Sequence, residues 1–134
     1  SSTSSGTSKM DAATNSTSGY AITYTGATLT SGANTITALS GAASSTGSSQ
    51  YGFNLKANTT PSVGSNVTGS GSGTAQTGYN TADSFKFLTG DTVASASGQT
   101  DSNTYTASYI ANISNTTNPG TYTSTITYIC TATY

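Results

Sequence analysis

Charged side chains are almost absent from this sequence. Its 134 residues include three Lys and four Asp but no Arg, Glu, His or Trp. Only 5% of residues are charged, whereas an average globular domain has about 25%. The net charge of −1 excludes the clustered Lys and Arg that bind nucleic acid or an anionic membrane surface. Ser, Thr, Asn and Gly dominate instead, and such a surface predicts an exported protein that packs against its own copies or carries sugars.

The missing histidine removes most routes to catalysis. General acid–base chemistry uses His, a perturbed carboxylate, Lys or Tyr, and the few Asp and Lys residues are scattered without a recognisable pair. A nucleophilic Ser needs a base that an orienting group holds in place, and no Ser-x-x-Lys replaces the absent His. We therefore predict that the protein is not an enzyme, and we expect no catalytic residue and no cofactor.

The sequence also lacks the residues of a zinc site, because it has no His and a single Cys. Calcium binds carboxylate and carbonyl oxygens, and Asp83, Asp91 and Asp101 lie in or near expected turns. Solvated turn aspartates are the ordinary interpretation of this pattern. Asp91 is the first candidate for a calcium ligand.

Covalent staples and membrane anchors are missing as well. Cys130 is the only cysteine, so no disulfide can form within the chain. We expect a small, buried apolar side chain on a strand there, with an intermolecular disulfide or a thiol anchor as the alternative. No run of about 18 apolar residues occurs, so no transmembrane segment is expected. The sequence begins with serines, as a processed chain or a fragment does.

What the sequence does contain is alternation of apolar and polar residues with a period of two, which predicts half-buried strands. The expected strands cover residues 19–25, 27–30, 35–39, 51–57, 84–88, 91–97, 104–113 and 121–134. Two stretches rich in Gly and Ser, residues 41–49 and 64–78, are expected loops, and no window has a helical period. The predicted fold is all-β, a single β-sandwich (Ig-like or jelly-roll-like) of about seven to nine strands over residues 9–134.

The core of such a sandwich would be small. Only 17 residues are Ile, Leu, Val, Met or Phe. Burying each contributes about 1.5–3 kcal/mol, against a backbone entropy cost of about 1–2 kcal/mol for every ordered residue. Tyr-rich packing, bound ions, glycans or neighbouring subunits must supply the remaining stability. This shortage is the first physical argument that the sandwich is completed by a strand from a neighbouring subunit.

Several stretches together resemble a known kind of secreted module. They are residues 15–39 (NSTSGYAITYTGATLTSGANTITAL), 51–55 with 58–61, 81–95 (TADSFKFLTGDTVAS), 108–114 and 120–134. The sequence resembles β-sandwich surface modules of reduced-genome episymbiotic bacteria, and it is distantly similar to WxL-type domains and TasA-like fibre-forming proteins. The resemblance covers about residues 9–134 and implies a β-sandwich, export and a role at the envelope. In TasA-like fibres, a neighbour's terminal segment fills a gap in the sheet.

We therefore expect a structural subunit of an extracellular filament, pilus (fimbria) or surface coat, a homo-polymer held together by strand donation. Residues 1–8 are expected to be flexible or exchanged between copies. The predicted donor is the segment 8–15, with Met10 and Ala12 as its apolar anchors. Residues 121–134 are the alternative donor or the acceptor edge, with self-association contacts at Tyr122, Tyr128 and Tyr134.

Sugars enter the predictions in two ways. The alternative function is a cell-surface adhesin or carbohydrate-binding module that recognises glycans or other cells through exposed tyrosines such as Tyr51, Tyr79 and Tyr109. The sequence also contains Asn-x-Ser/Thr sequons, which make the chain a candidate glycoprotein. The candidate glycosylation sites are Asn15, Asn58, Asn66, Asn112 and Asn115.

Overall fold

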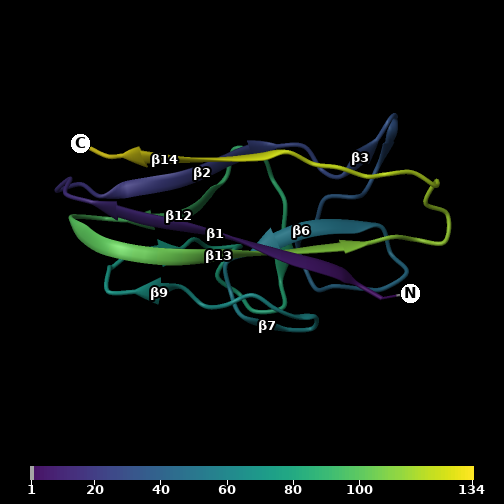
Figure 1. Ribbon diagram of the computed structural model, residues 1–134, viewed down its shortest axis with the longest axis horizontal. Helices are drawn as coiled ribbons and strands as arrows, with labels where there is room; N and C mark the ends of the chain where they lie inside the picture. Colours follow the sequence, from purple (N-terminus) through teal and green to yellow (C-terminus); the bar gives the residue numbers. More distant parts are fainter. Residues whose placement is uncertain (1) are drawn as a thin grey trace.

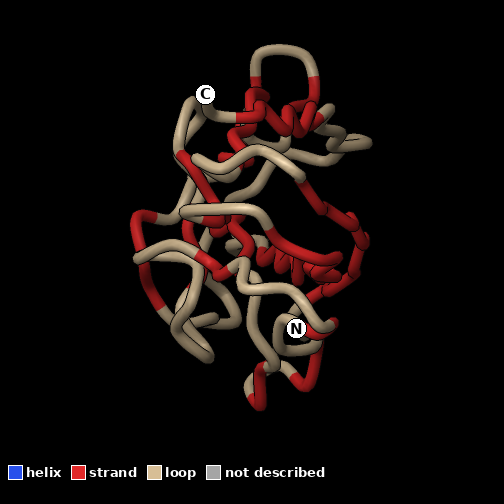
Figure 2. Tube along the Cα trace, turned by 90° about the vertical axis from the view of Figure 1, so that its left-hand side faces the viewer, coloured by secondary structure: helices blue, strands red, loops and turns tan. Residues whose placement is uncertain are grey.

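The computed structural model describes residues 2–134, and all regular structure in this range is β-strand (Figures 1 and 2). One sheet has the order β1-β13-β6-β11-β5, with β9 also paired to β13, and the other has the order β10-β12-β2-β14. The strands of the first sheet are β1 (Ser4–Thr14), β5 (Ser40–Ala42), β6 (Gln50–Asn54), β9 (Thr68–Gly69), β11 (Phe85–Lys86) and β13 (Thr100–Asn112). Those of the second are β2 (Tyr20–Gly26), β10 (Thr74–Ala75), β12 (Thr92–Ala96) and β14 (Ile126–Ala132).

Two small hairpins complete the fold. They are formed by β3 (Thr30–Ser31) with β4 (Asn34–Thr35), and by β7 (Asn58–Thr59) with β8 (Ser62–Val63). The all-β prediction is confirmed, and the two main sheets pack as in a β-sandwich. The fourteen strands exceed the expected number because seven of them have only two residues.

Tyrosines fill much of the space between the two sheets. The hydroxyls of Tyr20 on β2 and Tyr105 on β13 are 2.7 Å apart, so a hydrogen bond joins the sheets through the core. Tyr24 and Tyr79 form a second hydroxyl pair at 2.9 Å. All four side chains are buried. Each ring therefore buries apolar area while its hydroxyl keeps a partner, which compensates for the shortage of aliphatic residues.

The glycine-rich stretch 64–78 contains structure that its composition did not predict. It leaves the first sheet at β9, which pairs with β13, and enters the second at β10, which pairs with β12. At Gly73 a Cβ would lie 2.1 Å from the Tyr105 hydroxyl and 2.3 Å from the Tyr20 hydroxyl. Glycine is needed at this position because the backbone crosses directly over the buried tyrosine pair.

The C-terminal run of alternating residues forms a strand only over part of its length, Ile126–Ala132, beside β2. Further upstream, Thr123 makes an isolated bridge to Thr30. Cys130 on β14 is exposed, so the expectation of a buried cysteine is wrong. It lies opposite the buried Ile22, but β14 is the margin of its sheet and little of the molecule extends over this position.

The N-terminal segment is a strand of this chain's own sheet. β1 runs antiparallel along β13, from Ser4 opposite Ala111 to Thr14 opposite Thr100. Residues 4–8, which belong to the segment expected to be flexible or exchanged, are therefore paired here within one chain. No apolar alternation marks them as a strand, because these residues are Ser, Gly and Thr and bury no apolar side chain. Exchange between copies stays a prediction.

The margins of the two sheets differ in length. β5 and β10 end their sheets with three and two residues, whereas β1 and β14 end them with 11 and 7. Within residues 2–134, no strand pairs with the outer side of β1 or β14. Both long margins border the same hollow, so one side of the sandwich carries two unpaired strand edges.

Candidate functional site

A groove lies between β1 and β14 on this open side of the sandwich. Two adjoining hollows of about 480 and 210 Å³ form it, and they share Tyr51 and Tyr109 in their lining. We call this feature the lateral groove. Its apolar and aromatic lining consists of Leu29, Tyr51, Tyr109, Ile110, Ala111, Ile126 and Tyr128.

Hydroxyl groups connect the walls of the lateral groove. The hydroxyls of Tyr109 on β13 and Tyr128 on β14 are 2.6 Å apart, and Ser8 Oγ on β1 lies 3.0 Å from the Tyr109 hydroxyl. Desolvation raises the pKa of Tyr128, and its hydrogen bond with Tyr109 raises it further. Tyr128 is therefore neutral at physiological pH. The groove presents rings and hydroxyls, which suit an extended, uncharged peptide segment.

Few side chains attach β1 to the rest of the molecule. Residues 4–9 are exposed, Met10 is half-buried, and Ala12 is 7% exposed. The predicted anchors Met10 and Ala12 do face the core, but it is the core of their own chain. Beyond the backbone pairing with β13, side-chain hydrogen bonds come from Ser8 to Tyr109 and from the Thr104 hydroxyl to Asp11. Backbone hydrogen bonds therefore supply most of the attachment of β1.

The other predicted contacts at the C-terminal end are separated in space. Tyr128 lines the lateral groove. Tyr122 is half-buried and donates a hydrogen bond to the carbonyl oxygen of Asn118 at 2.9 Å. Tyr134 is fully exposed. Of the three tyrosines, only Tyr128 lies where a strand added at the open side would meet it.

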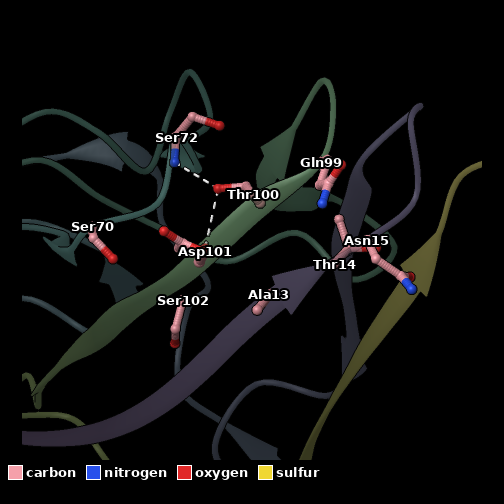
Figure 3. A pocket seen from close by; sticks show the side chains of 9 residues that line it. All are labelled: Ala13, Thr14, Asn15, Ser70, Ser72, Gln99, Thr100, Asp101 and Ser102. Atoms are coloured by element: carbon pink, nitrogen blue, oxygen red, sulfur yellow. Dashed lines mark hydrogen bonds between the residues drawn. The ribbon is translucent and has the colours of Figure 1, made fainter.

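Another hollow, of about 760 Å³ and separate from the lateral groove, lies at one end of the sandwich (Figure 3). Its lining is polar and comprises Ala13, Thr14, Asn15, Ser70, Ser72, Gln99, Thr100, Asp101 and Ser102. The Thr100 hydroxyl accepts a hydrogen bond from the Ser72 amide at 2.7 Å and donates one to the Asp101 carbonyl oxygen at 3.1 Å. With one carboxylate and no aromatic ring, this hollow has neither a paired acid and base nor a stacking platform for a sugar.

The aspartates considered for calcium are not brought together. In the described part of the chain, no group of three or more His, Cys, Asp or Glu could hold a metal ion. Asp91 Oδ2 is 2.7 Å from Lys86 Nζ and accepts a hydrogen bond from the Tyr79 hydroxyl at 2.9 Å. The Asp83 carboxylate accepts hydrogen bonds from the Thr59 hydroxyl and from the amides of Thr59 and Thr60, which lower its pKa. Both carboxylates thus have structural partners.

Burial separates the candidate glycosylation sites into two groups. Asn58 is 7% exposed and Asn112 is 2% exposed, and both side chains are hydrogen-bonded inside the fold. These two side chains are inaccessible to a glycosyltransferase in the folded chain. Asn15, Asn66 and Asn115 are exposed.

The three tyrosines expected to be exposed for sugar stacking are not equivalent. Tyr79 is fully buried and hydrogen-bonded to Tyr24, so its predicted exposure is wrong. Tyr51 is 6% exposed, although its edge reaches the lateral groove. Tyr109 is half-buried and lines the same groove. Of the three predicted tyrosines, a sugar in the groove would therefore meet mainly Tyr109, together with Tyr128, which was not predicted for this role.

Comparisons with protein-family models, with curated proteins and with solved structures returned no match. The resemblance to envelope modules therefore stays a prediction. In residues 2–134, the structure has no helix of the length and apolarity needed to cross a bilayer. The open side of the sandwich and the weakly anchored β1 are the features that point to a function.

Proposed function

We propose that this protein is a structural subunit of an extracellular filament, pilus or surface coat, and that copies join by exchanging the N-terminal strand. The observation that carries the proposal is the attachment of β1, an 11-residue margin strand that pairs along its length with β13. Only Met10 and Ala12 insert apolar side chains. A copy that releases β1 therefore loses little buried apolar surface and can regain the same backbone hydrogen bonds from the β13 of a neighbour.

The connection between β1 and β2 supports exchange. It spans residues 15–19 and passes from one sheet to the other. Extension of this short segment would carry β1 away from its own sheet, as occurs in domain swapping. One-directional exchange uses a different surface on each partner, and it produces a filament when the repeat does not close into a ring. The sequence composition, poor in charge and rich in Ser and Thr, supports a location outside the cell.

Electron microscopy of the purified protein tests the proposal. We expect filaments, and we expect none after deletion of residues 1–15. Because the truncated chain loses a strand, a full-length variant is also needed. The double substitution Met10→Asp and Ala12→Asp removes both anchors, while Ser5→Asp with Thr7→Asp adds the same charge at exposed positions of the same strand. Filaments that persist in the first double variant would contradict the proposal, and the second variant should still form filaments.

An adhesin or carbohydrate-binding module is the second candidate. It is supported by the lateral groove, in which Tyr109 and Tyr128 lie side by side with their hydroxyls hydrogen-bonded. Glycan-array binding by a strictly monomeric protein, lost on Tyr109→Ala, would favour this function over the structural one.

A further inference from the structure

The outer margin of β1 has free backbone groups in a regular order. Even-numbered residues of β13 direct their backbone toward β6. Tyr51 of β6 bonds away from β13, since its amide donates to the Thr37 carbonyl and its carbonyl accepts from the Leu39 amide, so its neighbour Gly52, opposite Ile110, bonds to β13. Odd-numbered residues of β13 therefore bond to β1, and their partners on β1 are even-numbered. The odd-numbered residues of β1 consequently direct their N–H and C=O groups outward, and they are Ser5, Thr7, Lys9, Asp11 and Ala13.

The same margin carries the only two charges on β1, and they have opposite sign. Lys9 and Asp11 are two residues apart, both are exposed, and both lie on the outward face of the strand. Within residues 2–134 the only side-chain ion pair joins Lys86 and Asp91, so Lys9 has no acidic partner there. A charged residue in the middle of a margin strand normally prevents pairing with another chain. Here its effect depends on the sequence of the approaching strand.

We propose that β1 pairs antiparallel with β1 of a second copy, across a two-fold axis at Met10. This register places Lys9 of each copy opposite Asp11 of the other, so the pair of charges is complementary to itself. Lys9 and Asp11 both have outward backbone groups, so these positions also form a hydrogen-bonded pair in the new ladder. Opposite charges that face each other across strands stabilise the pairing, whereas like charges destabilise it.

The charges also select this register over its neighbours. Because the outward groups belong to odd-numbered residues, the pairing can shift only in steps that keep odd residues opposite odd residues. The next register in one direction places Lys9 opposite Lys9, and the next in the other direction places Asp11 opposite Asp11. Each brings like charges together. The register centred on Met10 is the one that satisfies both charges.

This contact is distinct from strand exchange. The outer margin of β1 is free whether its inner margin pairs with the β13 of its own chain or with that of a neighbour. In a filament built by exchange, β1-to-β1 pairing would join two filaments side by side. In the absence of exchange it would give a closed dimer. The interface can therefore be tested whichever of these two forms the protein adopts.

Charge reversal followed by sedimentation analysis tests the proposal. In Lys9→Asp, a carboxylate at position 9 faces Asp11 of the other copy, and this happens at two places in each dimer. In Asp11→Lys, two lysines face each other at the same two places. Each variant should therefore weaken association by roughly tenfold or more. The double variant restores complementarity and should associate as the natural chain does. An equimolar mixture of the two single variants should also associate, because each supplies the charges that the other lacks.

Two controls make the outcome specific. Lys56→Asp and Asp101→Lys reverse one charge each outside β1, and neither should change association. Circular dichroism should show that every variant is folded. Association of the single variants at the natural strength, failure of the mixture to restore it, or a natural chain that stays unpaired at every concentration would each overturn the proposal. In a filament preparation, the corresponding images are paired filaments for the natural chain and single ones for Lys9→Asp.

Discussion

Alkaline pH should unfold this protein cooperatively, because its core is built on protonated tyrosines. Burial raises the pKa of Tyr20, Tyr24, Tyr79 and Tyr105 above the ordinary value of 10.0, desolvation being the largest cause in each case. In the unfolded chain, the same phenols lose their protons near pH 10. Above that pH the unfolded state binds fewer protons than the folded state, so the free energy of unfolding falls. Below pH 10 this contribution is fully present.

The size of the effect follows from the number of buried phenols. Each tyrosine that is protonated when folded and ionised when unfolded lowers the free energy of unfolding by about 1.4 kcal/mol per pH unit. Tyr20, Tyr24, Tyr79 and Tyr105 together give about 5.6 kcal/mol per pH unit. A stability of about 5–15 kcal/mol would then be exhausted within about one to three pH units above pH 10.

Absorbance at 295 nm, which reports phenolate, and far-ultraviolet circular dichroism should be followed together during an alkaline titration. We expect the buried set to ionise in one step that coincides with loss of strand signal. Tyr105→Phe should make the pH dependence shallower by about 1.4 kcal/mol per pH unit, because it removes one of the buried phenols. Ionisation of the buried tyrosines near pH 10 with the fold intact would refute this account of the core.

Three further predictions concern single positions. Gly73→Ala should lower the free energy of unfolding by about 1–3 kcal/mol in urea titrations, because its Cβ would overlap the Tyr20 and Tyr105 hydroxyls. Gly6→Ala is the control, because nothing lies within 4 Å of a Cβ at that position. Equal stabilities of the two variants would contradict the close approach at Gly73. Asn54→Ala should cost about 2–4 kcal/mol, since the buried amide donates to Asn58 Oδ1, Thr81 O and Ser84 O; the exposed Asn115→Ala should cost little, and a similar loss in both would refute the role of this network. Cys130 should react with a thiol reagent in the folded monomer, because it is exposed; reaction only in denaturant would show that the β14 margin is covered.

Apolar alternation in the sequence predicted the strands that bury side chains on one face. β2, with Tyr20, Ile22 and Tyr24 all buried, and the central part of β13 follow their patterns directly. Around β11 the predicted strand, residues 84–88, is longer than the observed one. Only Phe85–Lys86 forms a strand before the chain continues toward β12. Period-two alternation reports which residues face the core, and it does not report where the hydrogen-bonded ladder ends.

The features that alternation missed are held by backbone contacts. The first half of β1 has only Ser, Gly, Thr and Lys, so no side chain signals that it pairs with β13. β9 and β10 lie in a glycine-rich stretch. Glycine is needed there because the backbone at Gly73 passes close to the hydroxyls of the buried tyrosine pair. The burial of Cys130 was predicted wrongly. The alternation places this residue correctly on the inner face of its strand, but the strand is the margin of its sheet, where the inner face is left exposed. Sequence pattern distinguishes faces but does not distinguish a central strand from an edge.

An inter-copy disulfide is the most direct test of strand exchange. Asp11 on β1 and Thr104 on β13 lie opposite each other on the outward face, so one chain can carry Asp11→Cys and a second Thr104→Cys, each with Cys130→Ser. The mixed chains should be unfolded together, refolded under reducing conditions and then oxidised. If β1 is exchanged, the product is a mixed disulfide between the two chains, and a pair with Ser97→Cys in place of Thr104→Cys gives none. Absence of the mixed disulfide, with rapid intrachain bonding when one chain carries both cysteines, would show that β1 stays on its own β13.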